Sequence, residues 1–168
     1  MRQTAWGQFD RVTRALVAGA AGGLVGAGVK LLGELIFPPR SPGEPIPPAV
    51  AVSKLLTWLT GHPLLEERTT LAVQAFHWSF SLAVGALYGL SAEFWPRARI
   101  ARGAGFGVVL LLATHESLLP LTGLSLPWSQ IPLKEHASEL LTHVLFGVSV
   151  ELVRGAVRER VFGAPTAA

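Results

Sequence analysis

Histidine and glutamate side chains recur at helical spacing in the last third of the chain. His136, Glu139 and His143 stand three and four residues apart, so on an α-helix they project from one face. A carboxylate between two imidazoles suits a transition-metal site or a proton relay, because an unperturbed imidazole titrates near pH 6.5. The alternative interpretation is a polar helix end at which His136 is simply hydrated.

Two further histidines, His77 and His115, lie in two other apolar stretches. Either one alone would be interpreted as a side chain hydrogen-bonded across helices. Together with Glu139 and His143 they predict one shared cavity, in which the four side chains approach within about 5–8 Å of one another. The bound group would be a divalent transition metal or, less strongly favoured, a b-type haem between two facing histidines. Glu116, beside His115, is a weaker candidate.

Other ionisable residues within apolar stretches must face protein or water, because lipid does not solvate charge. Lys30 and Glu34 are one helical turn apart and predict an ion pair. Glu93 and Glu151 lie toward the opposite ends of their stretches, near Arg97 and Arg154 respectively, where they would anchor the helices. The alternative for these two carboxylates is an inner exit of a proton or ion path.

The composition excludes several classes of site. The chain has no cysteine, so it has no disulfide, no thiolate metal ligand, no c-type haem linkage and no thiol nucleophile. It also lacks a phosphate-binding Walker loop, a Gly-x-Ser-x-Gly elbow and a His-Glu-x-x-His zinc helix. We therefore expect a protein that is not an enzyme.

The elements that hold these residues are predicted to be membrane-spanning helices. Half of the residues are hydrophobic, 15% are charged and the mean hydropathy is +0.45, whereas soluble domains carry about 25% charged residues. A bilayer core needs about 20 apolar residues per helix. Four stretches qualify, and we expect residues 1–168 to form one all-α, four-helix transmembrane domain with spans at 14–37, 69–95, 101–119 and 133–153.

The segment 38–68 between the first two spans is rich in proline and is expected outside the membrane core. Within it, residues 50–59 form an amphipathic stretch that is too short to span and is expected to lie at the interface. The first span is longer than a signal sequence and carries Lys30 and Glu34, so we expect it to be retained.

Orientation follows from the distribution of lysine and arginine, which favours the cytoplasmic side. A cytoplasmic N-terminus and C-terminus place nine basic residues inside and four outside, with Lys30 within a span. The nine are Arg2, Arg11, Arg14, Arg97, Arg99, Arg102, Arg154, Arg158 and Arg160, and the four are Arg40, Lys54, Arg68 and Lys134. The pI near 10.0 therefore reflects membrane topology, and no nucleic-acid partner is expected.

Glycines stand four residues apart in three of the predicted spans. Such spacing lets helix backbones approach closely in lipid. It serves either packing within one chain or a homo-oligomer interface. The pairs are Gly19/Gly23, Gly22/Gly26, Gly85/Gly89 and Gly103/Gly107.

Several motifs resemble the YagU-like family of bacterial inner-membrane proteins over roughly residues 15–160. They are Val29-Lys30-Leu31-Leu32-Gly33-Glu34, Pro38-Pro39-Arg40-Ser41-Pro42, Ala92-Glu93-Phe94-Trp95-Pro96, Leu124-Ser125-Leu126-Pro127-Trp128 and Ser138-Glu139-Leu140-Leu141-Thr142-His143, with His77, His115, Glu151 and Arg154. The loop after Pro42 is shorter than in the family.

The resemblance implies a location in the bacterial cytoplasmic membrane, a contribution to acid resistance and no established biochemical activity. The family motifs include Arg40 together with Lys30 and Glu34, whereas His136 and Glu116 lie outside them. The leading hypothesis is a membrane protein that handles protons or a divalent cation from the periplasmic side. A haem-binding accessory subunit and a purely structural or assembly role are the alternatives.

Overall fold

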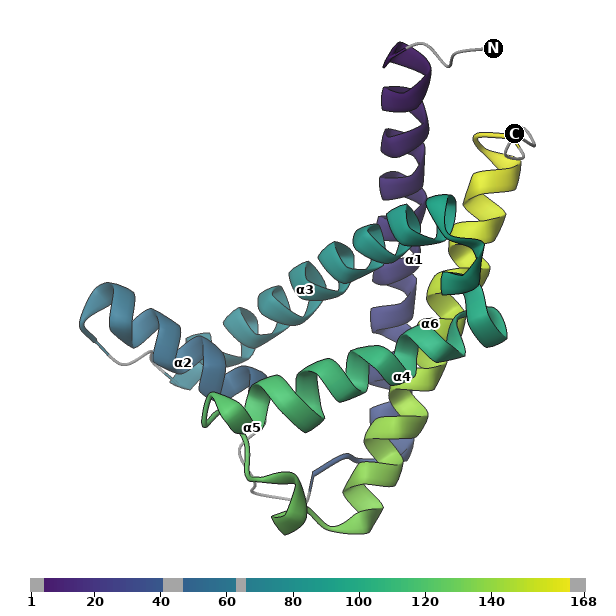
Figure 1. Ribbon diagram of the computed structural model, residues 1–168. Coiled ribbons are helices and arrows are strands. Elements are labelled where there is room, and N and C mark those ends of the chain that lie inside the picture. Colours follow the sequence, from purple (N-terminus) through teal and green to yellow (C-terminus); the bar gives the residue numbers. More distant parts are fainter. Residues whose placement is uncertain (1–4, 41–46, 63–65, 164–168) are drawn as a thin grey trace.

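The computed structural model describes residues 5–40, 47–62 and 66–163, which form helices joined by short turns and loops (Figure 1). Four helical stretches within these ranges are long and apolar enough to cross a membrane. They are Phe9–Ile36, Arg68–Phe94, Pro96–Leu121 and Leu133–Arg160. The prediction of an all-α, four-span membrane bundle is confirmed.

Three of the four spans are single long helices: α1 (Ala5–Ile36), α3 (Glu66–Phe94) and α6 (Leu133–Arg160). Prolines follow α1 and α3 closely, because a proline has no N–H to donate and disfavours helical geometry in the residue before it. The shorter α2 (Pro47–Thr60) contains the predicted interfacial stretch.

The third span is composite. It begins with the 3-10 segment η1 (Pro96–Gly103) and continues as α4 (Ala104–Ala113), the π-helical segment η2 (Thr114–Leu118) and the short α5 (Leu119–Leu121). A 3-10 turn, η3 (Trp128–Gln130), lies in the loop before α6. The sequence pattern did not predict the π-helical segment, which includes His115 and Glu116.

Helix α1 packs against both α3 and α6, and α4 packs against α6 (Figure 1). The backbones of α3 and α4 stay apart along most of their described length, and their side chains meet where the Tyr88 ring stacks on that of Phe106, with 4.4 Å between the centroids. The first part of α1 and the last part of α6 lie at the same end, where Arg14 Nη1 donates to the Phe162 carbonyl at 3.1 Å.

Glycines make the closest helix contacts. A methyl group added at Gly19 would lie 2.3 Å from the carbonyl oxygen of Gly85, and one at Gly107 would lie 2.1 Å from that of His143. These backbones therefore approach so closely that no side chain fits between them. Most of the predicted glycines lie at backbone contacts of this kind within the chain: Gly19, Gly23, Gly85 and Gly89 between α1 and α3, and Gly22, Gly103 and Gly107 against α6. Gly26 instead faces the side chains of Phe146 and Val150 in α6.

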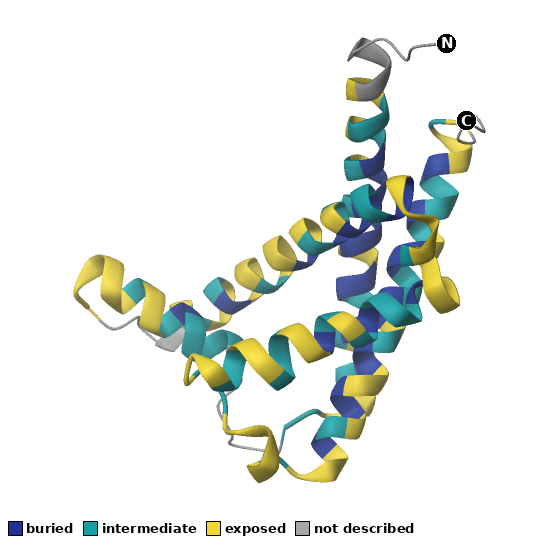
Figure 2. Ribbon diagram, viewed as in Figure 1, coloured by how far each residue is buried: buried dark blue, intermediate teal, exposed yellow. Residues whose placement is uncertain are grey.

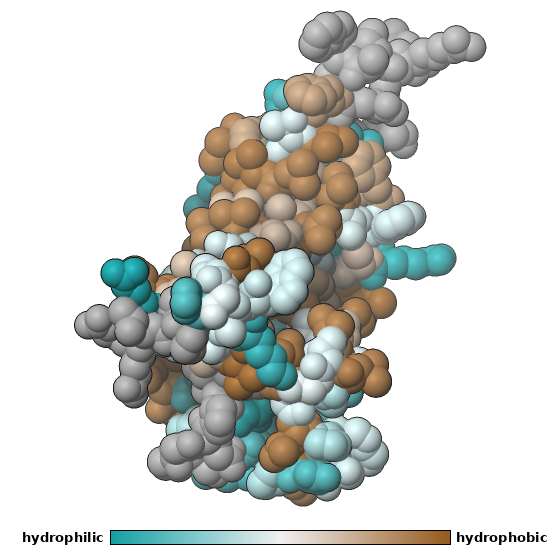
Figure 3. Space-filling view, turned by 90° about the vertical axis from the view of Figure 1, so that its left-hand side faces the viewer, coloured by the Kyte–Doolittle hydropathy of each residue, from teal (hydrophilic) through white to brown (hydrophobic). Residues whose placement is uncertain are grey.

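A small apolar core lies where the helices converge, formed by Tyr88, Ala92, Phe146 and Val150. Burial is concentrated along α1 and α6, whereas α2 and the outward sides of α3 and α4 are exposed (Figure 2). Figure 3 shows apolar side chains over the upper part of one face of the molecule. In a bilayer this apolar surface is the side that faces lipid.

Candidate metal-binding site

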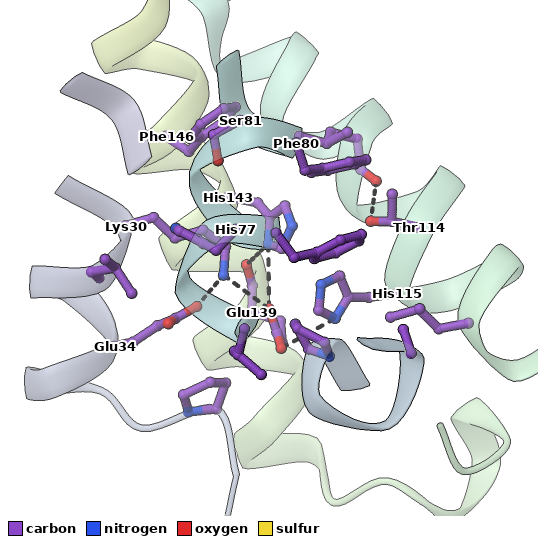
Figure 4. Close-up of a pocket in the computed structure, with 18 of the residues that line it drawn as sticks. Lys30, Glu34, His77, Phe80, Ser81, Thr114, His115, Glu139, His143 and Phe146 are labelled. Carbon is purple, nitrogen blue, oxygen red and sulfur yellow. Dashed lines mark hydrogen bonds and ion pairs between the residues drawn. The ribbon is translucent and has the colours of Figure 1, made fainter. Parts of the chain in front are cut away.

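A cavity of about 280 Å³ lies between the diverging α3 and α4, near the end of α1 and the start of α6. Most of its wall is apolar, with Phe76 and Phe80 on the α3 side. Its polar side chains point inward from several helices, as Figure 4 shows. They include Lys30, Glu34, Arg40, His77, His115, Glu139 and His143.

Three of these side chains converge at the centre of the cavity. One ligand atom from each of His115, Glu139 and His143 lies within 4.8 Å of the other two. His115 Nδ1 is 3.2 Å from Glu139 Oε1, and the rings of His115 and His143 are 4.9 Å apart between centroids. Glu139 and His143 are only 5% and 3% exposed. The contact between the two rings leaves no space for a porphyrin between them.

The backbone orients His143. Its Nδ1 lies 2.8 Å from the carbonyl oxygen of Glu139, one turn earlier in α6. A carbonyl oxygen accepts hydrogen bonds and cannot donate them, so this contact favours the tautomer with the proton on Nδ1, in which Nε2 is an acceptor. Metal-binding histidines are commonly held in this way, by a hydrogen bond from the nitrogen that does not bind the metal. The close contact of Gly107 with the His143 carbonyl fixes the position of this turn against α4.

Three buried side-chain atoms in the described part of the chain have no hydrogen-bond partner, and all three belong to this cavity. They are His77 Nε2, His115 Nδ1 and Glu139 Oε2, from α3, η2 and α6. Leaving such an atom unpaired costs about 1–3 kcal/mol. Charged groups lie near Glu139, but none of them forms a hydrogen bond with these three atoms. The cavity can therefore hold a ligand that bonds to them.

Two cations surround the Glu139 carboxylate. Lys30 forms an ion pair with Glu34, and its Nζ is also 3.6 Å from Glu139 Oε2. Arg40 Nη1 is 3.2 Å from Glu135 Oε2, and its Nη2 is 3.7 Å from Glu139 Oε1. Among the described residues of this region the cations are Lys30 and Arg40, and the carboxylates are Glu34, Glu135 and Glu139. We call these residues the His/Glu cluster: Lys30, Glu34, Arg40, His77, His115, Glu135, Glu139 and His143.

The structure places His136 and Glu116 outside this cluster. His136 Nδ1 is 2.8 Å from Glu116 Oε1, and His136 Nε2 is 2.9 Å from the carbonyl oxygen of Trp128. These residues line a second, shallower pocket. The predicted shared face of His136, Glu139 and His143 is therefore divided between two environments.

A second group of charged residues, the arginine cluster, lies at the opposite end of the bundle. Glu93 accepts hydrogen bonds from Arg11 at 2.9 Å and from Arg158 at 3.0 and 3.1 Å. Glu151 accepts them from Arg154, Arg99 and the Tyr88 hydroxyl at 2.6–2.9 Å. The predicted pairing of Glu151 with Arg154 is present, whereas Glu93 pairs with Arg11 and Arg158 and not with Arg97.

Sequence reasoning did not single out the roles of Glu135, Arg11, Tyr88, Arg99 and Arg158. Each of them pairs with a residue on another helix or segment. Spacing along one helix indicates pairs such as Lys30 and Glu34, but it carries no information about partners on other helices. The only available signal was polarity at the helix ends, which does not specify a partner.

Comparisons with known proteins place these residues in context. The model of a family described as a protein of unknown function, DUF1440, matches residues 24–152, a range that contains the whole His/Glu cluster. The chain is 26% identical over 174 residues to the inner membrane protein YagU of Escherichia coli (strain K12), covering 88% of this chain and 85% of that protein. No solved structure matches the chain.

Proposed function

This chain belongs to the DUF1440 family, and we propose that it is an inner-membrane protein that binds a divalent transition-metal ion at His115, Glu139 and His143. The observation that carries the proposal is the convergence of two imidazoles and a carboxylate within 4.8 Å in a buried cavity. His77, whose Nε2 lines the same cavity without a partner, is a candidate fourth ligand.

The donor set supports a metal ion. Imidazole and carboxylate together suit zinc and neighbouring first-row metals. In a tetrahedral site with bonds of about 2.0–2.2 Å, neighbouring ligand atoms are about 3.3–3.6 Å apart. The 3.2 Å between His115 Nδ1 and Glu139 Oε1 is close to that spacing.

The membrane location rests on the four spans and on the similarity to an inner membrane protein of Escherichia coli. The excess of basic residues near the arginine cluster supports cytoplasmic termini, which would open the cavity to the periplasmic side. Reporter fusions near Arg99 and after Arg160 should then indicate the cytoplasm, and fusions near Gly43 or Ser129 the periplasm. A periplasmic reporter signal after Arg160 would overturn this orientation.

A contribution to acid resistance would follow from competition between protons and the metal. Ligand histidines must be neutral to bind, so metal affinity decreases as the pH falls. The ion would therefore be held at neutral external pH and released, with uptake of protons, in acid. A protein that exchanges a metal for protons at its periplasmic side would respond directly to acid stress.

Elemental analysis of the protein purified in mild detergent and equilibrated with Zn²⁺ tests the proposal. About one ion per chain is expected, with loss of binding in His143→Ala and Glu139→Gln. His62→Ala is the matched control, because His62 is exposed and lies outside the cavity. An absorption spectrum of the same sample tests for haem.

Equal metal content in all three variants would place the metal elsewhere. No binding of zinc, cobalt or manganese by the unmodified protein would exclude the metal site. If His143→Ala nevertheless abolished acid survival while the protein stayed in the membrane, uptake of protons by the cluster would replace metal binding as the function.

A further inference from the structure

The turn that joins α3 to α4 is strongly basic. Its 3-10 segment η1 carries three arginines, Arg97, Arg99 and Arg102, and no acidic residue. The segment connects two membrane spans and packs beside α6, so it lies at the boundary between the apolar core of the bilayer and the headgroup layer (Figure 1). All three arginines are exposed, as is most of the segment (Figure 2). Positive side chains at this depth lie among the phosphates of the lipid headgroups.

Two of the three arginines are available to a ligand. Arg97 and Arg102 form no hydrogen bond or ion pair with any described residue. Arg99 differs, because its Nε donates to Glu151 Oε1 at 2.6 Å and so fastens the turn to α6. A guanidinium presents its donors in a planar fork that matches two oxygens of a phosphate. The turn is therefore held in place while two groups suited to phosphate remain unused.

The backbone of the turn has an unusual conformation. Ala101 and Arg102 have φ angles of 50° and 55°, in the left-handed region that residues with a side chain rarely adopt. Gly103 follows with a φ of 90°, and a methyl group added there would lie 2.2 Å from the Gly147 carbonyl oxygen of α6. Such conformations persist only where the surrounding structure imposes them, and they are concentrated at functional sites. The contacts with α6 thus fix the backbone that carries the arginines.

Large apolar side chains flank the arginines. Trp95 directly precedes η1 and is 69% exposed, and Ile100 within η1 is 65% exposed. Tryptophan is enriched at membrane interfaces, where its ring contacts apolar chains and its N–H stays in the polar layer. A phospholipid offers an anionic phosphate and apolar chains together, whereas a free anion offers charge alone. The combination of side chains therefore favours a lipid over a dissolved anion.

We propose that η1 binds an anionic phospholipid of the surrounding membrane, with the phosphate at Arg97 and Arg102 and the acyl chains against Trp95 and Ile100. The bound lipid holds the turn between α3 and α4 at a fixed depth in the membrane. The site lies at the end of the bundle opposite the His/Glu cluster, so it does not depend on the proposed metal ion.

Native mass spectrometry of the full chain in mild detergent tests the proposal. The protein is mixed with dioleoylphosphatidylglycerol or, separately, with dioleoylphosphatidylcholine, which has the same acyl chains and no net charge. Phosphatidylglycerol should bind about 25-fold more tightly, because each arginine near an anionic headgroup contributes about a fivefold factor. In about 0.5 M ammonium acetate most of this preference should disappear, since salt screens exposed charges. A parent protein without any preference would overturn the site.

Paired variants separate the site from general attraction between charges. The test variant carries Arg97→Gln and Arg102→Gln. The matched control carries Arg68→Gln and Lys134→Gln, which remove two exposed basic residues at the opposite ends of α3 and α6. Both variants lower the net charge by the same amount. The preference should disappear in the test variant and persist in the control. An equal loss in both, or a preference that survives in the test variant, would refute a site at η1.

A measurement on the unmodified chain keeps the proposal testable if the glutamine variant does not fold. Phenylglyoxal modifies accessible arginines, and the modified positions are identified by mass spectrometry of peptides. Phosphatidylglycerol should protect Arg97 and Arg102 at least fivefold relative to Arg68, the exposed control. Phosphatidylcholine and inorganic phosphate should give no such protection. Absence of protection by phosphatidylglycerol, or equal protection by inorganic phosphate, would overturn the lipid site.

Discussion

The two polar clusters lie on either side of one apolar core, yet their bonding differs. In the arginine cluster each of the two buried carboxylates accepts hydrogen bonds from two arginines, and Tyr88 adds another. In the His/Glu cluster, three buried side-chain atoms of the described residues, one each from His77, His115 and Glu139, have no hydrogen-bond partner. The carboxylates of the arginine cluster are therefore fully hydrogen-bonded, whereas the His/Glu cluster has polar atoms left to bind a ligand.

The chemistry of the side chains explains the difference. A guanidinium presents several donors in a rigid fork that matches a carboxylate, so arginine saturates its partner. An imidazole offers one donor and one acceptor, and the acceptor is free for a ligand. Phe146 and Val150 lie between His143 and Glu151 along α6, within the apolar core. The saturated cluster and this core close one end of the bundle, and the cavity belongs to the other.

The largest effect should come from breaking the saturated cluster. Arg158→Met removes three donors from a buried site and leaves Glu93 paired with Arg11 alone. Breaking a buried ion pair costs about 3–5 kcal/mol, so thermal unfolding in detergent should shift strongly downward. Arg97→Met is the control, because Arg97 is exposed and was the partner expected from sequence. Equal shifts in both variants would show that the cluster contributes no specific stability.

Sequence alone predicted the spans well, because apolar length and flanking prolines act locally. It predicted the pair of Lys30 and Glu34 for the same reason. It did not predict that Arg158 rather than Arg97 pairs with Glu93, since that choice depends on how α3 and α6 cross. The separation of His136 from His143 was also missed, because it depends on partners from another segment: His136 faces Glu116, and His143 faces His115.

A bound metal ion should stabilise the folded protein through the His/Glu cluster alone. At a free Zn²⁺ concentration of about 100 times the dissociation constant, binding adds about 2.7 kcal/mol to the free energy of unfolding. The rise in unfolding temperature should disappear in His143→Ala and persist in Arg158→Met, which alters the other cluster. A zinc-dependent rise that survives in His143→Ala would assign the ion to another site.

The ion pair of Lys30 and Glu34 in the His/Glu cluster should contribute less stability. Lys30→Met leaves Glu34 without its ion-pair partner and Arg40 as the one cation beside Glu139 among the described residues, at an expected cost of about 2 kcal/mol, since the Glu34 side chain is partly exposed. Adding Glu34→Gln should recover about half of that loss. Measured unfolding free energies decide the matter, and a double variant less stable than Lys30→Met would mean that the two residues do not pair.

The smallest change in stability is expected when one polar group is removed from each cluster in turn. Tyr88→Phe removes a hydroxyl that donates to Glu151 at 2.9 Å. The free energy of unfolding should fall by about 1.5–3 kcal/mol if the bond is fully formed, and by about 1 kcal/mol if Arg99 and Arg154 compensate. His77→Leu removes an imidazole whose buried Nε2 has no hydrogen-bond partner, so in metal-free protein it should change stability by less than about 0.5 kcal/mol or increase it. Both changes keep an apolar body of similar size in place. Unfolding of the two variants under the same conditions therefore compares a used polar atom with an unused one. A loss for His77→Leu as large as that for Tyr88→Phe would mean that both clusters are structural fasteners, whereas a neutral His77→Leu that weakens zinc binding would place His77 among the metal ligands.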